Sequence, residues 1–217
     1  MGTGSISGVD LRRFNPRAMT EVRDDIRHHL GIAPQALVIV FVGRLTKDKG
    51  IQELITAFRI MCQRREDLHL LLVGPLEPER DPLPPETLAE ISMNARIHTV
   101  GFASRPEQYL AAADIFCLPS YREGFGSVII EAGAMNVPSV ATRVTGVVDA
   151  VVEGETGLLV PAKDAPALAQ ALLQLAESPE ARQRIGQAAH RRVVQNFDAE
   201  VINQVVVDEY FRLAQTT

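Results

Sequence analysis

The sequence holds 217 residues, of which 46% are hydrophobic and 23% are charged, a length and composition that predict one globular domain with a sizeable core. The net charge of −5 argues against a general nucleic-acid binder, because such proteins usually carry a basic surface. No apolar run reaches the roughly 20 residues that a helix needs to cross a bilayer.

Apolar runs alternate with helical patterns along the chain. Residues 37–42 form a β-branched-rich apolar run that ends at Gly43, which predicts a buried parallel strand. Apolar residues then recur at helical spacing from 51 to 61. The alternation continues, with further strands expected at 68–73, up to 100, and at 115–118, 138–141 and 157–160, and helices at 86–94, 105–113, up to about 135, and at 164–177, 179–195 and 201–213. This order predicts an α/β fold with a Rossmann-like, doubly wound, mostly parallel sheet of about six strands.

Glycine, charged and hydroxyl residues follow the ends of several predicted strands. They are Arg44, Gly74, Gly101, the stretch 120–126 and the stretch 142–146. In a doubly wound sheet the ligand binds outside the carboxyl ends of the strands. The sequence therefore predicts that these residues meet at one rim and form a ligand site there.

Two glutamates flank a glycine-rich turn between a predicted strand and a predicted helix. The stretch reads Ser120-Tyr121-Arg122-Glu123-Gly124-Phe125-Gly126-Ser127-Val128-Ile129-Ile130-Glu131-Ala132. A strand–loop–helix unit of this kind points backbone N–H groups at an anion. Carboxylates beside it can accept hydrogen bonds from neutral hydroxyls. The combination suits a ligand that carries both phosphate and sugar.

This stretch resembles the Glu-x7-Glu motif of retaining, family-4-type glycosyltransferases with the GT-B fold, the glycosyl transferases group 1. Other segments occur in the family's order: Gly43-Arg44-Leu45 with Lys49-Gly50, Leu72-Val73-Gly74, Val100-Gly101-Phe102, Ala112-Ala113-Asp114 and residues 154–161. The resemblance spans about residues 38–197. It implies one half of a GT-B fold, with an interdomain linker remnant at 1–16 and a C-terminal nucleotide-sugar-binding domain at 17–217. We therefore expect the N-terminal acceptor domain to be absent from this chain.

The resemblance also implies roles for individual residues. Arg44 and Lys49 bind the diphosphate of the donor and stabilise it as it leaves, so that neither a divalent metal nor a cofactor is expected. Glu123 lies near the transferred sugar and completes the catalytic set. Backbone N–H groups of Phe125, Gly126 and Ser127 contact the sugar or the diphosphate.

Three further residues complete the predicted donor site. Glu131 is expected two turns into its helix, where it accepts hydrogen bonds from the ribose hydroxyls. Its apolar neighbours indicate a largely buried helix, and a buried glutamate without a partner is costly. Gly74 follows its strand, and Phe102 belongs to the segment that contacts the nucleobase, although a core position suits this phenylalanine equally well.

The function implied is the transfer of a hexose or N-acetylhexosamine from a nucleoside-diphosphate sugar, with UDP as the expected nucleotide, to a hydroxyl of a glycolipid or oligosaccharide. Bacterial surface-polysaccharide synthesis is the expected setting. Cys62 and Cys117 read as buried thiols, which favours the cytoplasm, at the inner face of the cytoplasmic membrane if the full enzyme makes peripheral contact with it. The isolated domain is expected to be inactive alone.

Two other functions share this architecture. One is a non-hydrolysing sugar-nucleotide 2-epimerase, which needs carboxylates and a histidine in other places. The other is a non-catalytic nucleotide-sugar-binding module, against which the presence of Arg44, Lys49, Glu123 and Glu131 counts.

Overall fold

A computed structural model of the chain describes residues 8–214, so residues 1–7 of the predicted linker at 1–16 lie outside the described residues. Six parallel strands form one sheet in the order β3-β2-β1-β4-β5-β6, which confirms the predicted fold class. The strands are β1 (Leu37–Val42), β2 (Leu68–Val73), β3 (Ile97–Gly101), β4 (Ile115–Leu118), β5 (Ser139–Thr142) and β6 (Gly157–Val160). The order reverses between β1 and β4, and a ligand in such a sheet binds at that reversal.

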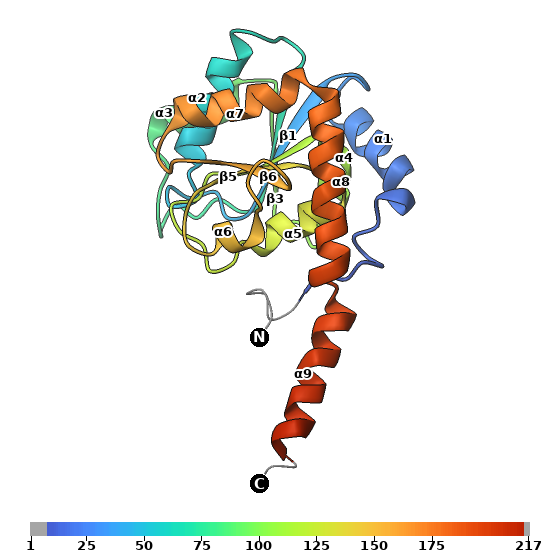
Figure 1. The fold of residues 1–217 in the computed structure, drawn as a ribbon. Helices are drawn as coiled ribbons and strands as arrows, with labels where there is room; N and C mark the ends of the chain where they lie inside the picture. Colours follow the sequence, from blue (N-terminus) through green and yellow to red (C-terminus); the bar gives the residue numbers. More distant parts are fainter. Residues whose placement is uncertain (1–7, 215–217) are drawn as a thin grey trace.

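Helices cover both faces of the sheet (Figure 1). They are α1 (Thr20–His29), α2 (Ile51–Cys62), α3 (Pro85–Met93), α4 (Pro106–Ala112), α5 (Ser127–Ala134), α6 (Val147–Ala150), α7 (Ala165–Glu177), α8 (Pro179–Asn196) and α9 (Ala199–Ala214), with a 3-10 turn η1 at Pro16–Met19. Helix α2 packs against α7 on one face, whereas α1 packs against α4 and α5 against α8 on the other. A cap separates α7 from α8, because the Ser178 hydroxyl accepts a hydrogen bond from the Ala181 N–H.

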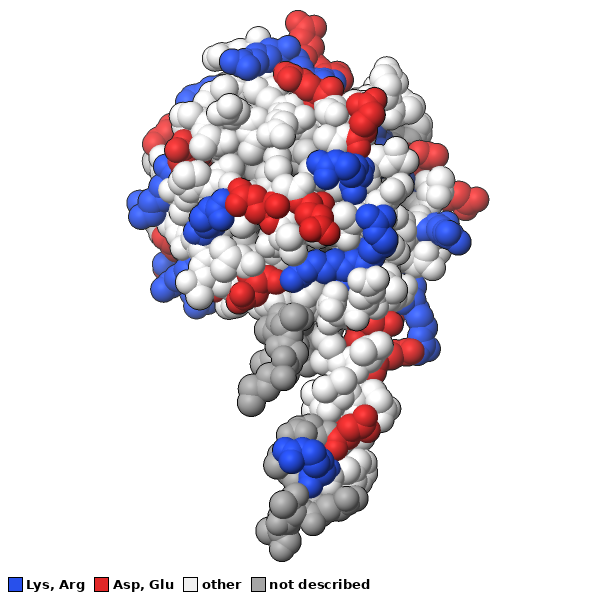
Figure 2. All heavy atoms as spheres, viewed as in Figure 1, with Lys and Arg blue, Asp and Glu red and all other residues white. Residues whose placement is uncertain are grey.

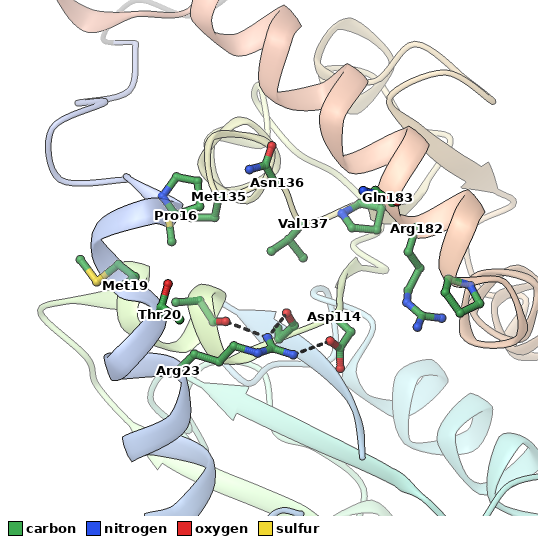
Figure 3. Close-up of a pocket in the computed structure, with 14 residues that line it drawn as sticks. Pro16, Met19, Thr20, Arg23, Asp114, Met135, Asn136, Val137, Arg182 and Gln183 are labelled. Atoms are coloured by element: carbon green, nitrogen blue, oxygen red, sulfur yellow. Dashed lines mark hydrogen bonds and ion pairs between the residues drawn. The ribbon is translucent and has the colours of Figure 1, made fainter. Parts of the chain in front are cut away.

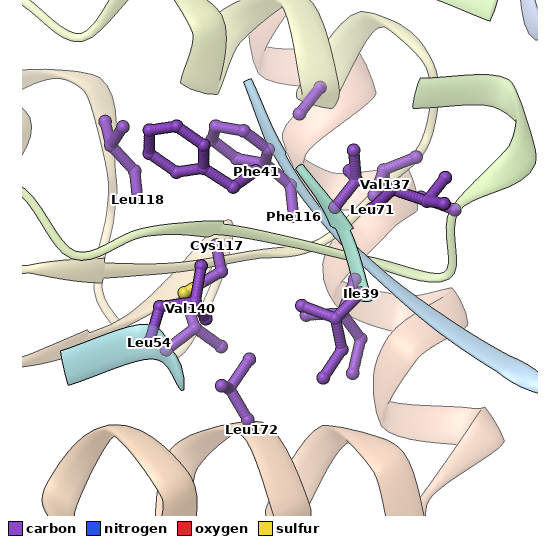
Figure 4. Packing of buried hydrophobic residues seen from close by; sticks show 14 of the residues in the cluster. Ile39, Phe41, Leu54, Leu71, Phe116, Cys117, Leu118, Val137, Val140 and Leu172 are labelled. Atoms are coloured by element: carbon purple, nitrogen blue, oxygen red, sulfur yellow. The ribbon is translucent and has the colours of Figure 1, made fainter. Parts of the chain in front are cut away.

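The core follows from the two-residue period of the strands. In β4, Phe116 and Leu118 point to one face of the sheet and Cys117 to the other, beside Leu54 of α2 and Leu172 of α7 (Figure 4). Cys117 is buried and Cys62 is half-buried, and both are free thiols.

The 3-10 turn η1 and helices α1 and α6 were not predicted. Helix α1 is mostly polar and is anchored by Asp114, whose two carboxylate oxygens bind Arg23 at 2.7 Å and Arg27 at 2.8 Å. Arg27 is 3% exposed and also donates to the carbonyls of Ala36 and Ala112. The contacts that hold this helix therefore include residues about 90 positions away.

The start of the described chain lies beside the junction between α8 and α9. Val9 is buried and exchanges backbone hydrogen bonds with Phe197 and Ala199 at 2.7 and 3.0 Å, so residues 8–16 pack on the domain. From there α9 leads away from the globular body (Figure 1). Its apolar side chains Val201, Val205, Val206, Val207 and Phe211 are 45% to 59% exposed.

Candidate functional site

The predicted rim brings three loops into backbone contact through glycines. Gly50 has φ +71°, and a Cβ there would lie 2.1 Å from the Pro119 carbonyl oxygen. Gly146 has φ +86°, and its Cβ would lie 2.2 Å from the carbonyl oxygen of Gly124. Only glycine permits both this backbone conformation and this distance. The loops after β1, β4 and β5 are therefore packed as one unit.

Lys49 and Glu123 meet on this unit. The Lys49 ammonium lies 2.6 Å from Glu123 Oε1, and the Ser120 hydroxyl donates to the same oxygen at 2.7 Å. Both charged side chains are less than one-fifth exposed, so the pair is well shielded from water. The structure thus joins two predicted site residues, and it adds Ser120, which orients the carboxylate.

Tyr121 ties the same two loops together from the other side. Its N–H donates to the Asp48 carbonyl at 2.9 Å, and its hydroxyl donates to Glu53 Oε1 on α2 at 2.7 Å. The Lys163 ammonium lies 4.8 Å from the centre of the Tyr121 ring, which is a cation–π distance. These contacts fix the position of the loop after β4, which carries Glu123 two residues farther on.

Arg44 is engaged by a carboxylate that sequence reasoning did not single out. Its guanidinium lies 2.8 Å from Glu77 Oε2, on the loop that follows β2. On the same loop, Asp81 accepts a hydrogen bond of 2.6 Å from the Asp48 N–H. Gly74 permits the close approach of these loops, because a Cβ there would lie 1.8 Å from the Gly43 carbonyl oxygen. Two acidic side chains therefore contact the loop on which a phosphate is expected.

The N-terminus of α5 opens onto the rim. Gly126, with φ +69°, is the N-cap and supplies no side-chain cap to the helix. Ser127 is exposed at the first position, and the half-buried ring of Phe125 lies 5.5 Å from that of Phe197. The first N–H groups of such a helix attract an anion.

Glu131 begins the second turn of α5, because the helix starts at Ser127; the prediction of two turns was one turn too deep. Burial is the main cause that raises the pKa of Glu131 to about 7, with Arg13 lowering it and Glu107 raising it. Among residues 8–214 its carboxylate has no hydrogen-bond partner. A half-buried carboxyl group without donors is therefore available to a ligand.

Phe102 is 81% exposed, so the alternative of a core position was wrong. It follows Gly101, whose carbonyl accepts from the Gly74 N–H at 2.8 Å. An exposed aromatic at a strand end offers a stacking surface to a flat ligand group.

A separate hollow of about 370 Å³ lies at the amino ends of the strands, lined by α1, α8 and the segments before β4 and β5 (Figure 3). Its charged groups already have protein partners, since Arg23 binds Asp114 and two backbone carbonyls, and Arg182 donates to the carbonyls of Leu175 and Ala176. We therefore assign the candidate site to the carboxyl ends of the strands.

Acidic and basic side chains alternate on the face of the molecule shown in Figure 2. Within residues 8–214 no group of three metal-ligating side chains occurs.

Comparison with known proteins identifies what the chain is similar to. The family model described as glycosyl transferases group 1 matches residues 22–192. The capsular polysaccharide biosynthesis glycosyltransferase CapM of Staphylococcus aureus is 33% identical over 202 residues, covering 93% of this chain and 52% of CapM.

Solved structures agree with this result. HepE from Anabaena in complex with UDP-glucose is 27% identical with a TM-score of 0.83, covering 94% of this chain and 56% of HepE. The C-terminal domain of the group 1 glycosyl transferase LpcC from Francisella tularensis is 25% identical with a TM-score of 0.77, covering 88% of this chain and 99% of that domain. The chain spans about half the length of the curated relatives it matches.

Proposed function

The chain belongs to the glycosyl transferases group 1 family, and from this premise we propose that it is the nucleotide-sugar-binding domain of a retaining glycosyltransferase. The full enzyme transfers a hexose or N-acetylhexosamine from a nucleoside-diphosphate sugar to a hydroxyl of a glycolipid or oligosaccharide. UDP is the nucleotide we favour, because the Anabaena relative was solved with UDP-glucose. The resemblance to CapM supports a place in bacterial surface-polysaccharide synthesis.

One observation carries the proposal: two cations, a shielded glutamate and a free helix N-terminus converge on one rim. Lys49 and Glu123 are hydrogen-bonded there, and Arg44 extends from the same loop as Lys49. In the proposed complex Arg44 and Lys49 bind the diphosphate, and the N–H groups at the start of α5 bind its oxygens. Glu131 accepts hydrogen bonds from the ribose hydroxyls.

None of the helices in the described residues is long and apolar enough to cross a membrane.

Stabilisation of the leaving diphosphate supplies most of the proposed catalysis. As the sugar–phosphate bond breaks, negative charge grows on the diphosphate oxygens, and fixed cations favour that state over the intact donor. The Glu123 carboxylate keeps the Lys49 ammonium in place at 2.6 Å before the donor arrives. The two cations supply the charge, and the chain needs no divalent metal in this proposal.

The exposed apolar side chains of α9 support the presence of a second domain in the full enzyme. Five large apolar side chains on one helix are 45% to 59% exposed, which is unfavourable in water. We propose that the N-terminal acceptor domain covers this helix and forms the opposite wall of the site. On this proposal the isolated chain binds the donor and transfers no sugar, because the cleft lacks the wall that brings the acceptor and excludes water.

Calorimetry with UDP, GDP and ADP tests the proposal on the chain itself. Arg44→Ala and Lys49→Ala should each weaken binding by roughly 1.5–3 kcal/mol, the value of a charge-assisted hydrogen bond. Lys47→Ala is the matched control, because this lysine is exposed on the same loop. Equal affinities in the wild type and both variants would contradict the assignment.

Product analysis separates the three functions. Incubation with UDP-N-acetylglucosamine should release no 2-epimer, which an epimerase would form. A polypeptide that includes the second domain should transfer labelled sugar to a glycolipid acceptor. Donor binding without transfer by that longer polypeptide would identify a binding module instead.

A further inference from the structure

We propose that Glu77 is an internal competitor of the donor diphosphate: its carboxylate occupies the Arg44 guanidinium until the diphosphate displaces it. The inference rests on the proposed function and concerns the β2–α3 loop, residues 74–84. A carboxylate and a phosphate offer a guanidinium the same pair of acceptor oxygens, so they compete for one position. The Arg44–Glu77 distance of 2.8 Å is that of a full hydrogen-bonded ion pair.

The two cations of the rim differ in how firmly they are held. Lys49 and Glu123 are 17% and 14% exposed, and Ser120 also binds the glutamate. Arg44 and Glu77 are 35% and 28% exposed, and no other side chain orients the Glu77 carboxylate among the described residues. Partly exposed ion pairs contribute little free energy. A diphosphate can therefore displace Glu77 from Arg44, whereas the Lys49 ammonium has three N–H donors and can bind the diphosphate while it stays paired with Glu123.

The β2–α3 loop is built so that its middle can move while its ends stay in place. At the start, the Leu45 N–H donates to the Pro75 carbonyl at 2.8 Å, and at the far end Leu83 is buried. Between these anchors the backbone hydrogen bonds are long, at 3.3 Å for the Arg80 N–H and 3.4 Å for the Asp81 N–H, both donating to the Glu77 carbonyl. Residues 77–80 are thus held by long backbone hydrogen bonds between the Pro75 contact and Asp81, whose carboxylate accepts from the Asp48 N–H at 2.6 Å.

The competition adds selectivity for the diphosphate. A nucleoside has no group that can replace Glu77 on Arg44, so its binding leaves the ion pair intact. A nucleoside diphosphate gains the Arg44 contact and loses the Arg44–Glu77 contact, so its net gain is reduced. Neutralising Glu77 should therefore strengthen diphosphate binding and leave nucleoside binding unchanged.

The test measures the affinity of the chain for UDP and for uridine by calorimetry, in Glu77→Gln and in Glu79→Gln. Glu79 is the matched control, because it is an exposed glutamate of the same loop and its substitution removes the same charge. Glu77→Gln should tighten UDP binding about two- to fivefold, the factor that corresponds to a partly exposed ion pair. Uridine binding should not change, and Glu79→Gln should leave UDP binding nearly unchanged, because the charge of an exposed side chain is screened by salt.

A double-mutant cycle with Arg44→Met shows whether Glu77 acts through Arg44. In the Arg44→Met background Glu77→Gln should have no effect on UDP affinity, because the contested guanidinium is gone. An effect that persists there, equal gains from Glu77→Gln and Glu79→Gln, or weaker UDP binding by Glu77→Gln would overturn the inference while leaving the proposed function intact. A wild-type chain that binds none of UDP, GDP and ADP would overturn both.

Discussion

Replacing Glu131 by glutamine should make the domain more stable and its nucleotide binding weaker. Burial raises the pKa of Glu131 from 4.5 to about 7, so the folded state holds a proton that the unfolded state releases between those two values. The free energy of unfolding therefore falls as the pH rises from 4.5 to 7, and it stays at the lower value above pH 7. The difference in pKa corresponds to about 3 kcal/mol. Glutamine has nearly the same shape and carries no charge, so it avoids this cost.

Urea unfolding of the wild type and of Glu131→Gln at two pH values is the assay. At pH 8 the variant should be more stable by roughly 2–3 kcal/mol, because its amide also needs partners in the site. At pH 5 the gain should be below about 1 kcal/mol, since the wild-type carboxyl is protonated there in the folded state. Glu86→Gln, at an exposed glutamate of α3, should stay within about 0.5 kcal/mol of the wild type at both pH values.

Ligand binding should show the opposite effect. Ribose hydroxyls donate to the ionised carboxylate, so binding of UDP-glucose, whose diphosphate has no proton that titrates between pH 6 and pH 8, should release a proton near neutral pH and strengthen from pH 6 to pH 8. Calorimetry in buffers of different ionisation enthalpy measures that proton, and Glu131→Gln should abolish it. A variant no more stable than the wild type at pH 8 would refute the reasoning on the buried charge, and proton release that survives the substitution would refute the ribose assignment.

Three other predictions concern the framework. Gly50→Ala should cost about 2–4 kcal/mol in urea unfolding because its Cβ would lie 2.1 Å from Pro119, whereas Gly31→Ala, also at positive φ but with nothing within 4 Å, should cost about 1 kcal/mol. His69 Nδ1 and His98 Nε2 lie 3.0 Å apart, and burial lowers the pKa of both side chains. The free energy of unfolding should therefore fall as the pH drops below 6.5, and His98→Gln should make this fall less steep. An equally steep fall in the variant would contradict the prediction. Deleting residues 203–214, the part of α9 beyond Ile202, should shift the urea midpoint little, because Val205, Val206, Val207 and Phe211 are exposed, and a large loss would show that this part of the helix supports the fold.

The sheet could be predicted because its strands carry their own signal. Residues 37–42 and 115–118 are apolar throughout, residues 68–73 are apolar apart from His69, and the structure places β1, β4 and β2 there without a shift. Helix α1 could not be predicted in this way, because only Val22 and Ile26 of its ten residues are large and apolar. Its position depends on Arg23 and Arg27 reaching Asp114, which is a contact that no local pattern contains.

The site was predicted in outline, and its internal partners were not. A strand end followed by glycine and charge predicts a rim residue, which gave Arg44 and the stretch that contains Glu123, and the family resemblance added Lys49. Sequence does not show which carboxylate reaches which cation across two loops, so Glu77 could not be singled out. The exposure of Phe102 could not be predicted for the same reason, because it depends on which residues pack around the end of β3, and the sequence does not show that.

The rim glycines and the charged residues carry different weight for function. Gly50, Gly74 and Gly146 are each required by a backbone contact between loops, so the fold alone explains them. Glu131 is different, because its burial raises its pKa to about 7 and residues 8–214 supply no hydrogen bond that offsets the cost of its charge. A domain shaped by stability alone would gain from an uncharged residue at this position. The cost is therefore best understood as the requirement of a ligand that brings its own donors, which is the strongest reason to expect nucleoside binding at this rim.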